Sequence, residues 1–376
     1  MSLDKIVKIL LVFIPITVIL ELTQSNPVFI FIAAALAVIP LADLIGEATE
    51  ELALYTGPKI GGLLNATLGN AAELIITIFA LREGLVDLVR ASITGSILGN
   101  LLLVLGLSLL LGGLKNGIQH FDRRTAGLNA TMLILAVVAL VIPSLFDVAI
   151  QQNLAAELGL SEGVAVIMIV LYGLSVFYAF THASPKADHH ADPVGAATPP
   201  AVRHEDEHKP KWSIPVASAV LVVATLAIVF MSEALVGAVE HVTVTLGLSE
   251  FFIGIIIVPL VGNVAEHLVA VQVALKNKME LSLAVSLGSS LQVALFVAPV
   301  LVFVSLLLGG QPLLLVFTNF ELIALIAASL IAAFIALDGE SNWLEGAMLL
   351  GVYVMLALAF YVVPAVEAAA ASGAHP

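Results

Sequence analysis

Long apolar segments separated by short polar stretches are the dominant pattern of this chain. About 20 consecutive apolar residues in an α-helix cross a hydrocarbon core of about 30 Å. Eight segments of about this length carry few or no charges: Ile60–Leu81, Ala91–Leu114, Thr125–Phe146, Gly163–Thr181, Trp212–Met231, Phe251–Leu275, Leu281–Leu308 and Gly346–Val366. Three others are less regular: Ile6–Leu22, the segment that follows Pro27 and acquires acids from Asp43 onward, and the short Leu322–Leu337. The pattern therefore predicts an all-α integral membrane protein with eleven transmembrane helices.

Composition supports this prediction and excludes several classes of protein. Of the 376 residues, 60% are hydrophobic and 11% are charged, whereas a soluble globular domain has about 45–50% apolar and about 25% charged residues. The chain has no cysteine, which excludes disulfide frameworks, cysteine-based zinc sites and thiol catalysis. Its formal net charge of −14 argues against a nucleic-acid partner and indicates a cationic one.

The basic residues predict how the chain sits in the membrane, because Lys and Arg are retained on the cytoplasmic side. With the N-terminus inside, only Arg82 and Arg90 of the 14 basic residues lie outside, and the others lie in or beside cytoplasmic segments. We therefore expect a cytoplasmic N-terminus, an external C-terminus and a cytoplasmic loop at 183–211. A compact chain without targeting extensions favours the plasma membrane of a prokaryote.

The loop at 183–211 separates two halves that contain the same short motifs. The sequence GNAAE at 69–73 reappears as GNVAE at 262–266, and GSIL at 95–98 reappears at the same offset as GSSL at 288–291. Agreement without a gap across two helices and a loop indicates an internal repeat. Five helices is an odd number, so the second copy enters the membrane inverted, which is an architecture of secondary transporters. The predicted units are the first helix at 1–26, the first repeat at 27–182, the linker at 183–211, the second repeat at 212–366 and a tail at 367–376.

Functional side chains are expected where the two repeats are most alike. Glu73 and Glu266 are isolated acids near the middle of their predicted spans. An acid near the bilayer midplane is costly and is a functional hypothesis by default. Asn70 and Asn263 stand three residues earlier, so each helix presents an amide and a carboxylate on one face. If the repeats face each other, these groups form a site of two carboxylates and two amide oxygens. Such ligands suit Ca²⁺ or, less specifically, Mg²⁺ or Mn²⁺.

Two buried carboxylates also predict a link between metal binding and proton binding. Desolvation and mutual repulsion disfavour the charged forms, whereas a divalent cation favours them. Metal ions and protons then compete for the same oxygens, which is the simplest physical basis for exchanging one for the other. The alternative is a pair of neutral acids hydrogen-bonded within a structural core. The symmetric Asn–Glu pairs favour the ion site.

Polar residues on the helices that follow are candidates to complete the metal site. Ser96 and Asn100 in the first half, and Ser289, Ser290 and Gln292 in the second, interrupt otherwise aliphatic runs. Each side chain could equally form a hydrogen bond between helices. The sequence leaves both roles open.

Glycines accompany both groups of polar residues. Gly95 and Gly99, four residues apart, favour close contact between helices. Gly69 and Gly262 directly precede the asparagines and favour local unwinding or close backbone approach at the ligand. Pro259 adds a kink signal to the second of these spans.

A second acidic set lies on the helices that open the two repeats. Asp43 pairs with Glu233 and Glu50 with Glu240, in a weaker alignment than that of the central motifs. These acids either line the aqueous approaches and concentrate cations, or are simply solvated near helix ends. His267, directly after the second motif, is a candidate proton carrier. One helical step turns it about 100° away from the glutamate, so a packing role is an equal alternative.

The motifs at 69–73 and 262–267, in an eleven-helix chain with a charged central loop, resemble those of the cation/proton exchangers, the CAX family of the Ca²⁺/cation antiporter superfamily. The resemblance covers Ile6 to Val366. It implies one helix followed by two five-helix repeats, with motif glutamates that bind Ca²⁺ in alternation with protons. By position, it also implies a site lined by Asn70, Asn263, Ser96, Ser289 and Gln292.

The central loop departs from the family pattern. Relatives often carry an acidic helix there, whereas 183–211 mixes acids with prolines and with His189, His190, His204 and His208. A long ordered helix is not expected through so much proline. Histidine clusters can bind Zn²⁺ or Ni²⁺, but a flexible polar linker is the commoner outcome.

These observations predict an antiporter that exports Ca²⁺ from the cytoplasm against inward proton flow, with no cofactor. A sodium-coupled Ca²⁺ exchanger is disfavoured, because such exchangers carry Pro before the motif acid, where this chain has Ala72 and Ala265. A divalent cation channel is disfavoured because channels usually gain symmetry by oligomerising, whereas this chain contains its own inverted pair. The chain has no metalloprotease, nucleophile-elbow or P-loop motif that would indicate an enzyme. The sequence allows a homo-oligomer and does not fix its size.

Overall fold

The computed structural model describes residues 7–147, 149, 153–182 and 210–371. Within these residues the chain is almost entirely helical, which confirms the predicted all-α class. Two short strands, β1 (Gln119–His120) and β2 (Glu340–Ser341), form one antiparallel pair. Most of the predicted linker, with its four histidines, lies outside the described residues.

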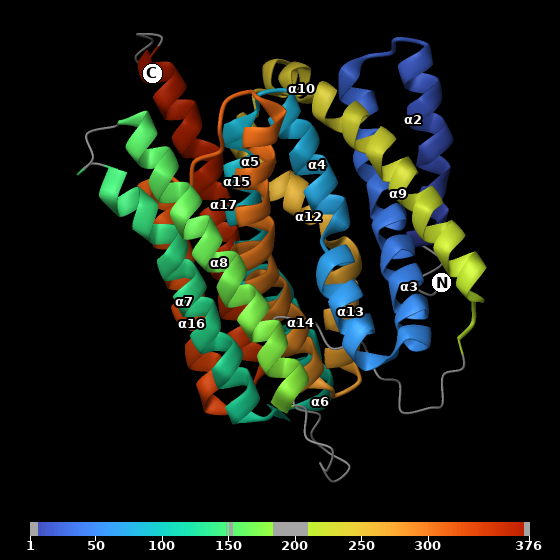
Figure 1. Cartoon of the computed structure of the whole chain (residues 1–376), viewed down its shortest axis with the longest axis vertical. Coiled ribbons are helices and arrows are strands. Elements are labelled where there is room, and N and C mark those ends of the chain that lie inside the picture. Colours follow the sequence, from blue (N-terminus) through green and yellow to red (C-terminus); the bar gives the residue numbers. More distant parts are fainter. Residues whose placement is uncertain (1–6, 148, 150–152, 183–209, 372–376) are drawn as a thin grey trace.

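The first half of the chain forms a run of helices interrupted by short segments of other helix types. Its elements are the 3₁₀-helix η1 (Leu10–Val12), α2 (Phe13–Leu22), α3 (Pro27–Leu68), α4 (Ala71–Arg82), α5 (Val86–Leu98), the π-helix η2 (Gly99–Val104), α6 (Leu105–Asn116), α7 (Arg123–Asp147) and α8 (Leu154–His182). Figure 1 shows α3 turning near its lower end, so that its last residues lead back up toward α4.

The second half has the same kind of organisation. Its elements are α9 (Ile214–Gly237), α10 (Val239–Leu246), α11 (Glu250–Phe252), the π-helix η3 (Ile253–Ile257), α12 (Val258–Gly262), α13 (Val264–Leu275), α14 (Met279–Gln292), the π-helix η4 (Val293–Val297), α15 (Ala298–Leu308), α16 (Asn319–Asp338) and α17 (Trp343–Ala371). The last helix therefore continues beyond Val366, where the sequence pattern placed its end.

Element boundaries repeat with the same offset as the sequence motifs. α4 and α13 each have 12 residues and begin at Ala71 and Val264. α5 and α14 begin at Val86 and Met279, and each is followed by a π-helix. Figure 1 shows α4 rising toward one end of the bundle and α13 descending toward the other. Both features agree with an inverted internal repeat.

Eight helices in the described part of the chain are long and apolar enough to cross a membrane. A ninth candidate is the pair Val239–Leu246 and Glu250–Gly262, which is bent by 115°. The number eleven therefore stays a prediction. The predicted spans Ile60–Leu81 and Phe251–Leu275 are not continuous helices, because each is broken at its central motif. Of the predicted span Ile6–Leu22, the described α-helix α2 accounts for ten residues.

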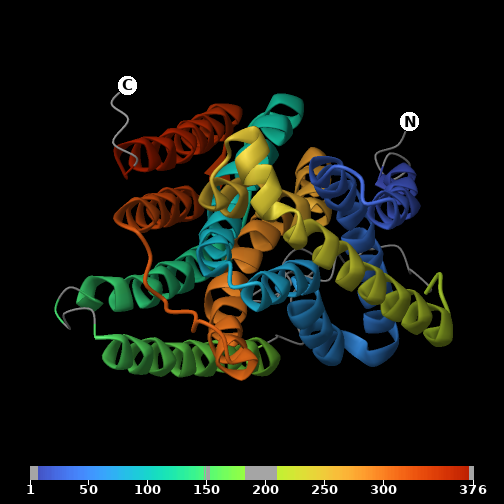
Figure 2. The ribbon, with the colours of Figure 1, turned by 90° about the horizontal axis from the view of Figure 1, so that it is seen from above.

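The helices form a central group between two outer groups. In the view of Figure 2, α4, α5 and α12–α15 lie in the middle, α2, α3 and α9 lie on one side, and α7, α8, α16 and α17 lie on the other. In an apolar stretch of 18 residues within Val86–Asn116, 72% of the residues are buried, against 22% for the corresponding stretch of Ile214–Gly237 and 17% for that of Trp343–Val362. The central helices thus form the protein core, and the outer helices present apolar side chains to the surroundings.

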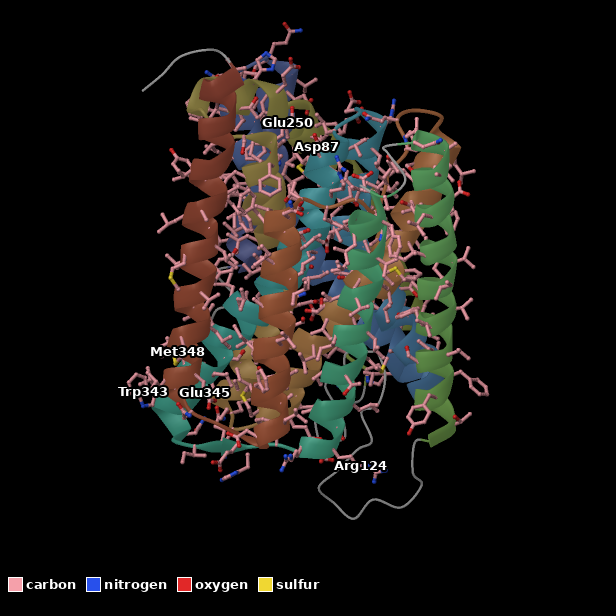
Figure 3. The ribbon with its side chains drawn as sticks, turned by 90° about the vertical axis from the view of Figure 1, so that its left-hand side faces the viewer. Asp87, Arg124, Glu250, Trp343, Glu345 and Met348 are labelled. Atoms are coloured by element: carbon pink, nitrogen blue, oxygen red, sulfur yellow. The ribbon has the colours of Figure 1, made fainter. Side chains whose placement is uncertain are left out.

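The two ends of the bundle are distinguished by the linker. We call the end at which α8 finishes and α9 begins the linker face; it lies at the bottom of Figure 1. Figure 3 shows Arg124 of α7 and Trp343 of α17 near this face, and Asp87 of α5 and Glu250 of α11 near the opposite face. α5 therefore begins at the opposite face and runs toward the linker face, whereas α14 begins at the linker face.

Glycine permits the closest helix contact in the centre. A β-carbon at Gly95 would overlap the backbone carbonyl of Ile255, and one at Gly254 would lie 2.6 Å from the carbonyl oxygen of Leu88. α5 therefore packs directly on η3, as predicted for Gly95. The same prediction is wrong for Gly99, since a β-carbon there would meet no atom within 4 Å.

Candidate ion-binding site

Both central motifs lie at breaks between helices. Gly69 and Asn70 separate α3 from α4, and Asn263 separates α12 from α13. Asn70 has φ −97° and ψ 17°, and Asn263 has φ −111° and ψ 7°, so neither residue continues the α-helix. The unwinding predicted from the Gly-Asn sequence is confirmed. Two helix N-termini, with their free backbone N–H groups, result from it.

Each motif glutamate lies in the first turn of the helix that follows the break. Glu73 belongs to α4 and Glu266 to α13. A helix N-terminus carries partial positive charge and stabilises a negative group there. Because α4 and α13 run in opposite directions from the centre, both positive ends lie close to the middle of the bundle. The helix breaks thus favour two carboxylates at a depth where they would otherwise be disfavoured.

Glu73 is fully buried and is held by groups from both repeats. The Ser96 hydroxyl donates a hydrogen bond to Glu73 Oε1 over 2.5 Å. Asn263 Nδ2 lies 3.4 Å from Glu73 Oε2 and 3.2 Å from Ser96 Oγ. A β-carbon at Gly262 would lie 3.6 Å from the Glu73 β-carbon. The second motif therefore packs directly against the first glutamate, as the inverted pairing predicted.

Asn70 makes the reciprocal contact between the repeats. Its Nδ2 donates a hydrogen bond to Gln292 Oε1 over 2.7 Å, and both side chains are buried. Each motif asparagine therefore bonds to the opposite repeat, but to a different kind of partner. The first repeat has Gly99 at the position equivalent to Gln292, so this contact has no counterpart.

Several oxygen atoms at the centre are buried and unpaired within the described part of the chain. They are Asn70 Oδ1, Asn263 Oδ1, Glu266 Oε2 and Ser289 Oγ. A buried acceptor without a partner costs about 1–3 kcal/mol. Carboxylate and amide oxygens are the ligands that Ca²⁺ prefers. The centre thus offers the donor set that a hard divalent cation would use, contributed by both repeats.

A third buried acid provides a contrast. Glu321 lies in the first turn of α16, and its oxygens accept hydrogen bonds from Thr94 Oγ1 over 2.9 Å, from the Thr318 backbone N over 2.8 Å and from Thr318 Oγ1 over 2.9 Å. With Thr318 it forms a capping box. The pattern T-x-x-E could have identified it in the sequence. Because its donors come from its own helix cap and from Thr94, and none belongs to the repeated motifs, we assign Glu321 a structural role.

The remaining residues predicted for the site are buried but less clearly connected. Asn100 lies in η2, and its Nδ2 has no partner among the described residues. Ser289 lies beside Glu266, although their contact does not meet the geometry of a hydrogen bond. His267 is buried, and its side chain forms no hydrogen bond within the described ranges. The structure therefore supports positions near the centre for these three residues without assigning them a role.

The second acidic set lies apart from the central site. Glu50, Glu233 and Glu240 are exposed, and Asp43 is partly exposed. No three or more His, Asp or Glu side chains of the described residues are grouped so as to hold a metal ion. A metal at the centre must therefore use amide or hydroxyl oxygens besides the two carboxylates.

Glu51 differs from its exposed neighbour Glu50. It is buried, and its Oε2 accepts a hydrogen bond from the Trp212 backbone N over 3.1 Å. The Tyr55 hydroxyl donates to the Trp212 carbonyl over 2.8 Å. These bonds tie α3 to the start of α9, which Figure 1 shows crossing it. No sequence pattern indicated this contact.

Residues 26–181 and 216–362 match the sodium/calcium exchanger protein family. The two matched stretches contain both central motifs and leave out the linker. The chain belongs to this family. The match thus extends to both halves of the predicted repeat.

Relatives within the family are similar over nearly the whole chain. A Ca²⁺/H⁺ antiporter of Aphanothece halophytica is 44% identical over 371 residues, which cover 95% of this chain and 96% of that protein. The Ca²⁺/H⁺ antiporter ChaA of Bacillus subtilis is 45% identical over 350 residues, which cover 93% and 96%. These relatives are antiporters and not enzymes. The resemblance to cation/proton exchangers drawn from the motifs is confirmed.

A solved structure supports the same conclusion for the fold. Native YfkE matches with a TM-score of 0.81 and 42% identity, covering 95% of this chain and 99% of that one. The predicted membrane-transporter fold is therefore confirmed.

Proposed function

We propose that this protein exchanges Ca²⁺ for H⁺ by binding them alternately at Glu73 and Glu266. The observation that carries the proposal is the set of buried unpaired oxygens where the inverted motifs meet, which includes Asn70 Oδ1, Asn263 Oδ1 and Glu266 Oε2. Two relatives that match nearly the full length are named Ca²⁺/H⁺ antiporters, which supports the same pair of substrates.

Charge balance explains why the two substrates exclude each other. Two protonated glutamates carry no charge, and two carboxylates balance the charge of one Ca²⁺. An empty, ionised pair would leave two negative charges in a low-dielectric interior, which is costly. We therefore expect the site to change sides only when it is loaded with Ca²⁺ or with protons. That restriction converts two separate binding events into an exchange.

The asparagine side chains can contribute to the site both when it holds Ca²⁺ and when it holds protons. Asn70 Nδ2 is held by Gln292, and Asn263 Nδ2 by Glu73 and Ser96, so each amide nitrogen already has a partner. The opposite end of each amide, Oδ1, is left for the ion. Ca²⁺ takes six to eight oxygen ligands in flexible geometry. We assign the remaining ligands to Ser96, Ser289 and Asn100 and to water.

The direction of transport and the orientation of the protein in the membrane are inferred from the distribution of basic residues. We place the linker face in the cytoplasm, because Lys and Arg concentrate in the segments at that end. Transport then removes Ca²⁺ from the cytoplasm as protons enter across the plasma membrane. The exposed acids Glu50, Glu233 and Glu240, with Asp43, are proposed to attract cations to the two approaches. The functional units are the repeats at 27–182 and 212–366, joined by the linker and preceded by the first helix.

The experiment that tests this proposal is ⁴⁵Ca uptake into proteoliposomes that contain the purified protein. With an imposed pH gradient, Ca²⁺ should accumulate while the gradient dissipates. With a Na⁺ gradient alone, no uptake above protein-free vesicles is expected. Uptake driven only by sodium would replace the proton with Na⁺ as the coupled ion. Uptake that follows the Ca²⁺ gradient alone and ignores both imposed gradients would instead indicate a channel.

A further inference from the structure

The helix α14 carries three serines whose hydroxyl groups are unpaired within the described part of the chain, and the proposed site uses only that of Ser289. Ser282, Ser286 and Ser289 are fully buried, and their hydroxyls have no partner among the described residues. The spacing of four and then three residues places them on one face of the helix. Ser290, on the same helix and equally buried, instead donates to the Ser286 carbonyl over 2.9 Å. The other three hydroxyls make no such bond to the backbone of their own helix.

That face of α14 leads toward the second glutamate. Val285 packs with Ala270 of α13 and Val104 of η2 in one cluster. Ser282 and Ser289 stand three residues before and four residues after Val285, so they lie on the face that meets α13 and η2. Because α14 begins at the linker face, the serines form a line from that face to the neighbourhood of Glu266.

The first repeat has a shorter series of buried serines on α5, which approaches the centre from the face opposite to the linker. Ser92 is fully buried and lies beside Glu73, although their contact does not meet the geometry of a hydrogen bond, and its hydroxyl has no other partner in the described ranges. It lies one helical turn before Ser96, which bonds to Glu73. α5 begins at the face opposite to the linker (Figures 1 and 3). The two lines are not copies of each other, because Val89, Ile93 and Val285 occupy the positions equivalent to Ser282, Ser286 and Ser92.

We propose that Ser282 and Ser286 line a hydrated route between the linker face and Glu266, and that Ser92 lines the corresponding route between the opposite face and Glu73. Hydroxyl groups both donate and accept hydrogen bonds, so they can hold water molecules in a membrane-embedded core where unpaired polar groups are otherwise disfavoured. Such a chain of water molecules would connect the two-glutamate site with the linker face in one state of the exchange cycle and with the opposite face in the other. This inference rests on the proposed function for its use of protons, but not for the existence of the routes.

The natural absence of cysteine makes the routes directly testable. S282C, S286C and S92C would each carry a single thiol, and S290C is the matched control on the same helix. Ag⁺, in chloride-free buffer, would be applied to one face of proteoliposomes of known protein orientation, and the remaining thiols would be counted after denaturation. S282C and S286C should react from the linker face at least about tenfold faster than S290C, because a close-packed interior excludes the ion. S92C should react faster than S290C from the opposite face.

Equal rates for S282C, S286C and S290C at both faces would overturn the proposal, as would reaction of S282C only from the face opposite to the linker. Labelling requires no transport, so it is separable from ⁴⁵Ca uptake by the unlabelled wild type. Sided labelling without pH-driven uptake would retain the routes and reject the antiport function. Uptake without sided labelling would retain the function and reject the routes.

Discussion

At the scale of single residues, hydrogen-bond partners distinguish the buried acids better than burial does. Glu73 and Glu321 are both buried and both have a donor on each oxygen, but the donors of Glu321 are Thr318 of its own cap and Thr94. Glu73 is held by Ser96 and Asn263, which belong to the motifs themselves. Glu266 retains an unpaired oxygen. The sequence predicted which acids are central, but not which of their oxygens are free.

Replacing either motif acid should abolish exchange. Glu73→Gln and Glu266→Gln keep the side-chain volume but remove the charge and the titratable group. Because each single change disables the same site, the double variant should be no worse than either one. ⁴⁵Ca uptake by purified, folded protein is the measurement.

Glu321→Gln is the matched control for these two variants. It should lower stability by about 1 kcal/mol through the weakened cap, while uptake persists. Near-normal exchange by either motif variant would refute the shared site.

The motif asparagines should contribute to Ca²⁺ affinity without carrying protons. Asn70→Ala and Asn263→Ala each remove one candidate ligand oxygen, so the apparent Ca²⁺ affinity should fall about tenfold, corresponding to about 1.4 kcal/mol. Asn129→Ala, a buried asparagine on α7, is the control and should bind Ca²⁺ like the wild type. Equilibrium ⁴⁵Ca binding distinguishes the cases. Affinities of all three variants equal to that of the wild type would remove the amides from the site.

At the scale of helices, the sequence predicted where the spans are broken better than it predicted where the helices begin and end. Gly69 and Gly262 before the asparagines indicated the unwinding that the structure has. Hydropathy placed the start of one span at Gly163, whereas α8 begins at Leu154. The stretch that contains Glu157 and Glu162 is too polar for hydropathy to mark it as part of a membrane span, but it is helical in the structure. The three π-helices had no sequence signal, because they change hydrogen bonding without changing composition.

Close contact between α5 and η3 should make Gly95 sensitive to substitution. Gly95→Ala places a β-carbon against the Ile255 carbonyl, so we expect a loss of about 1–3 kcal/mol from overpacking. Gly99→Ala, on the next turn of the same segment, enters open space and should be tolerated. Thermal unfolding in detergent compares the two variants. Equal midpoints would show that the helices do not approach as closely as described.

At the scale of the whole molecule, repetition and charge predicted the architecture. The common offset of the motifs also holds for α4 and α13 and for the starts of α5 and α14. The differences between the halves could not be predicted. Asn70 bonds to Gln292, whereas Asn263 bonds to Glu73, because Gln292 replaces a glycine in one copy only. Such asymmetry depends on side-chain packing between repeats, which motif spacing does not contain.

Membrane orientation gives a prediction for the whole chain. A protease site inserted near Ala196 should be cut in inside-out vesicles and protected in intact cells, because the linker is placed in the cytoplasm. A tag after Pro376 should show the opposite pattern, and serves as the internal control. Cleavage of the linker site in intact cells would invert the topology and the direction of transport.

Competition between Ca²⁺ and protons for one pair of glutamates is the central claim, and Ca²⁺ affinity as a function of pH tests it most directly. A protonated carboxyl loses its charge and a ligand oxygen. Affinity of the purified wild type should therefore fall as the pH is lowered from about 8.5 to about 5.5, a range in which buried acids titrate. In Glu73→Gln and Glu266→Gln the dependence should be weakened together with the affinity. Unchanged affinity across this range, in a protein that still exchanges Ca²⁺ for protons, would contradict the account and direct attention to His267, Asp43, Glu50, Glu233 and Glu240.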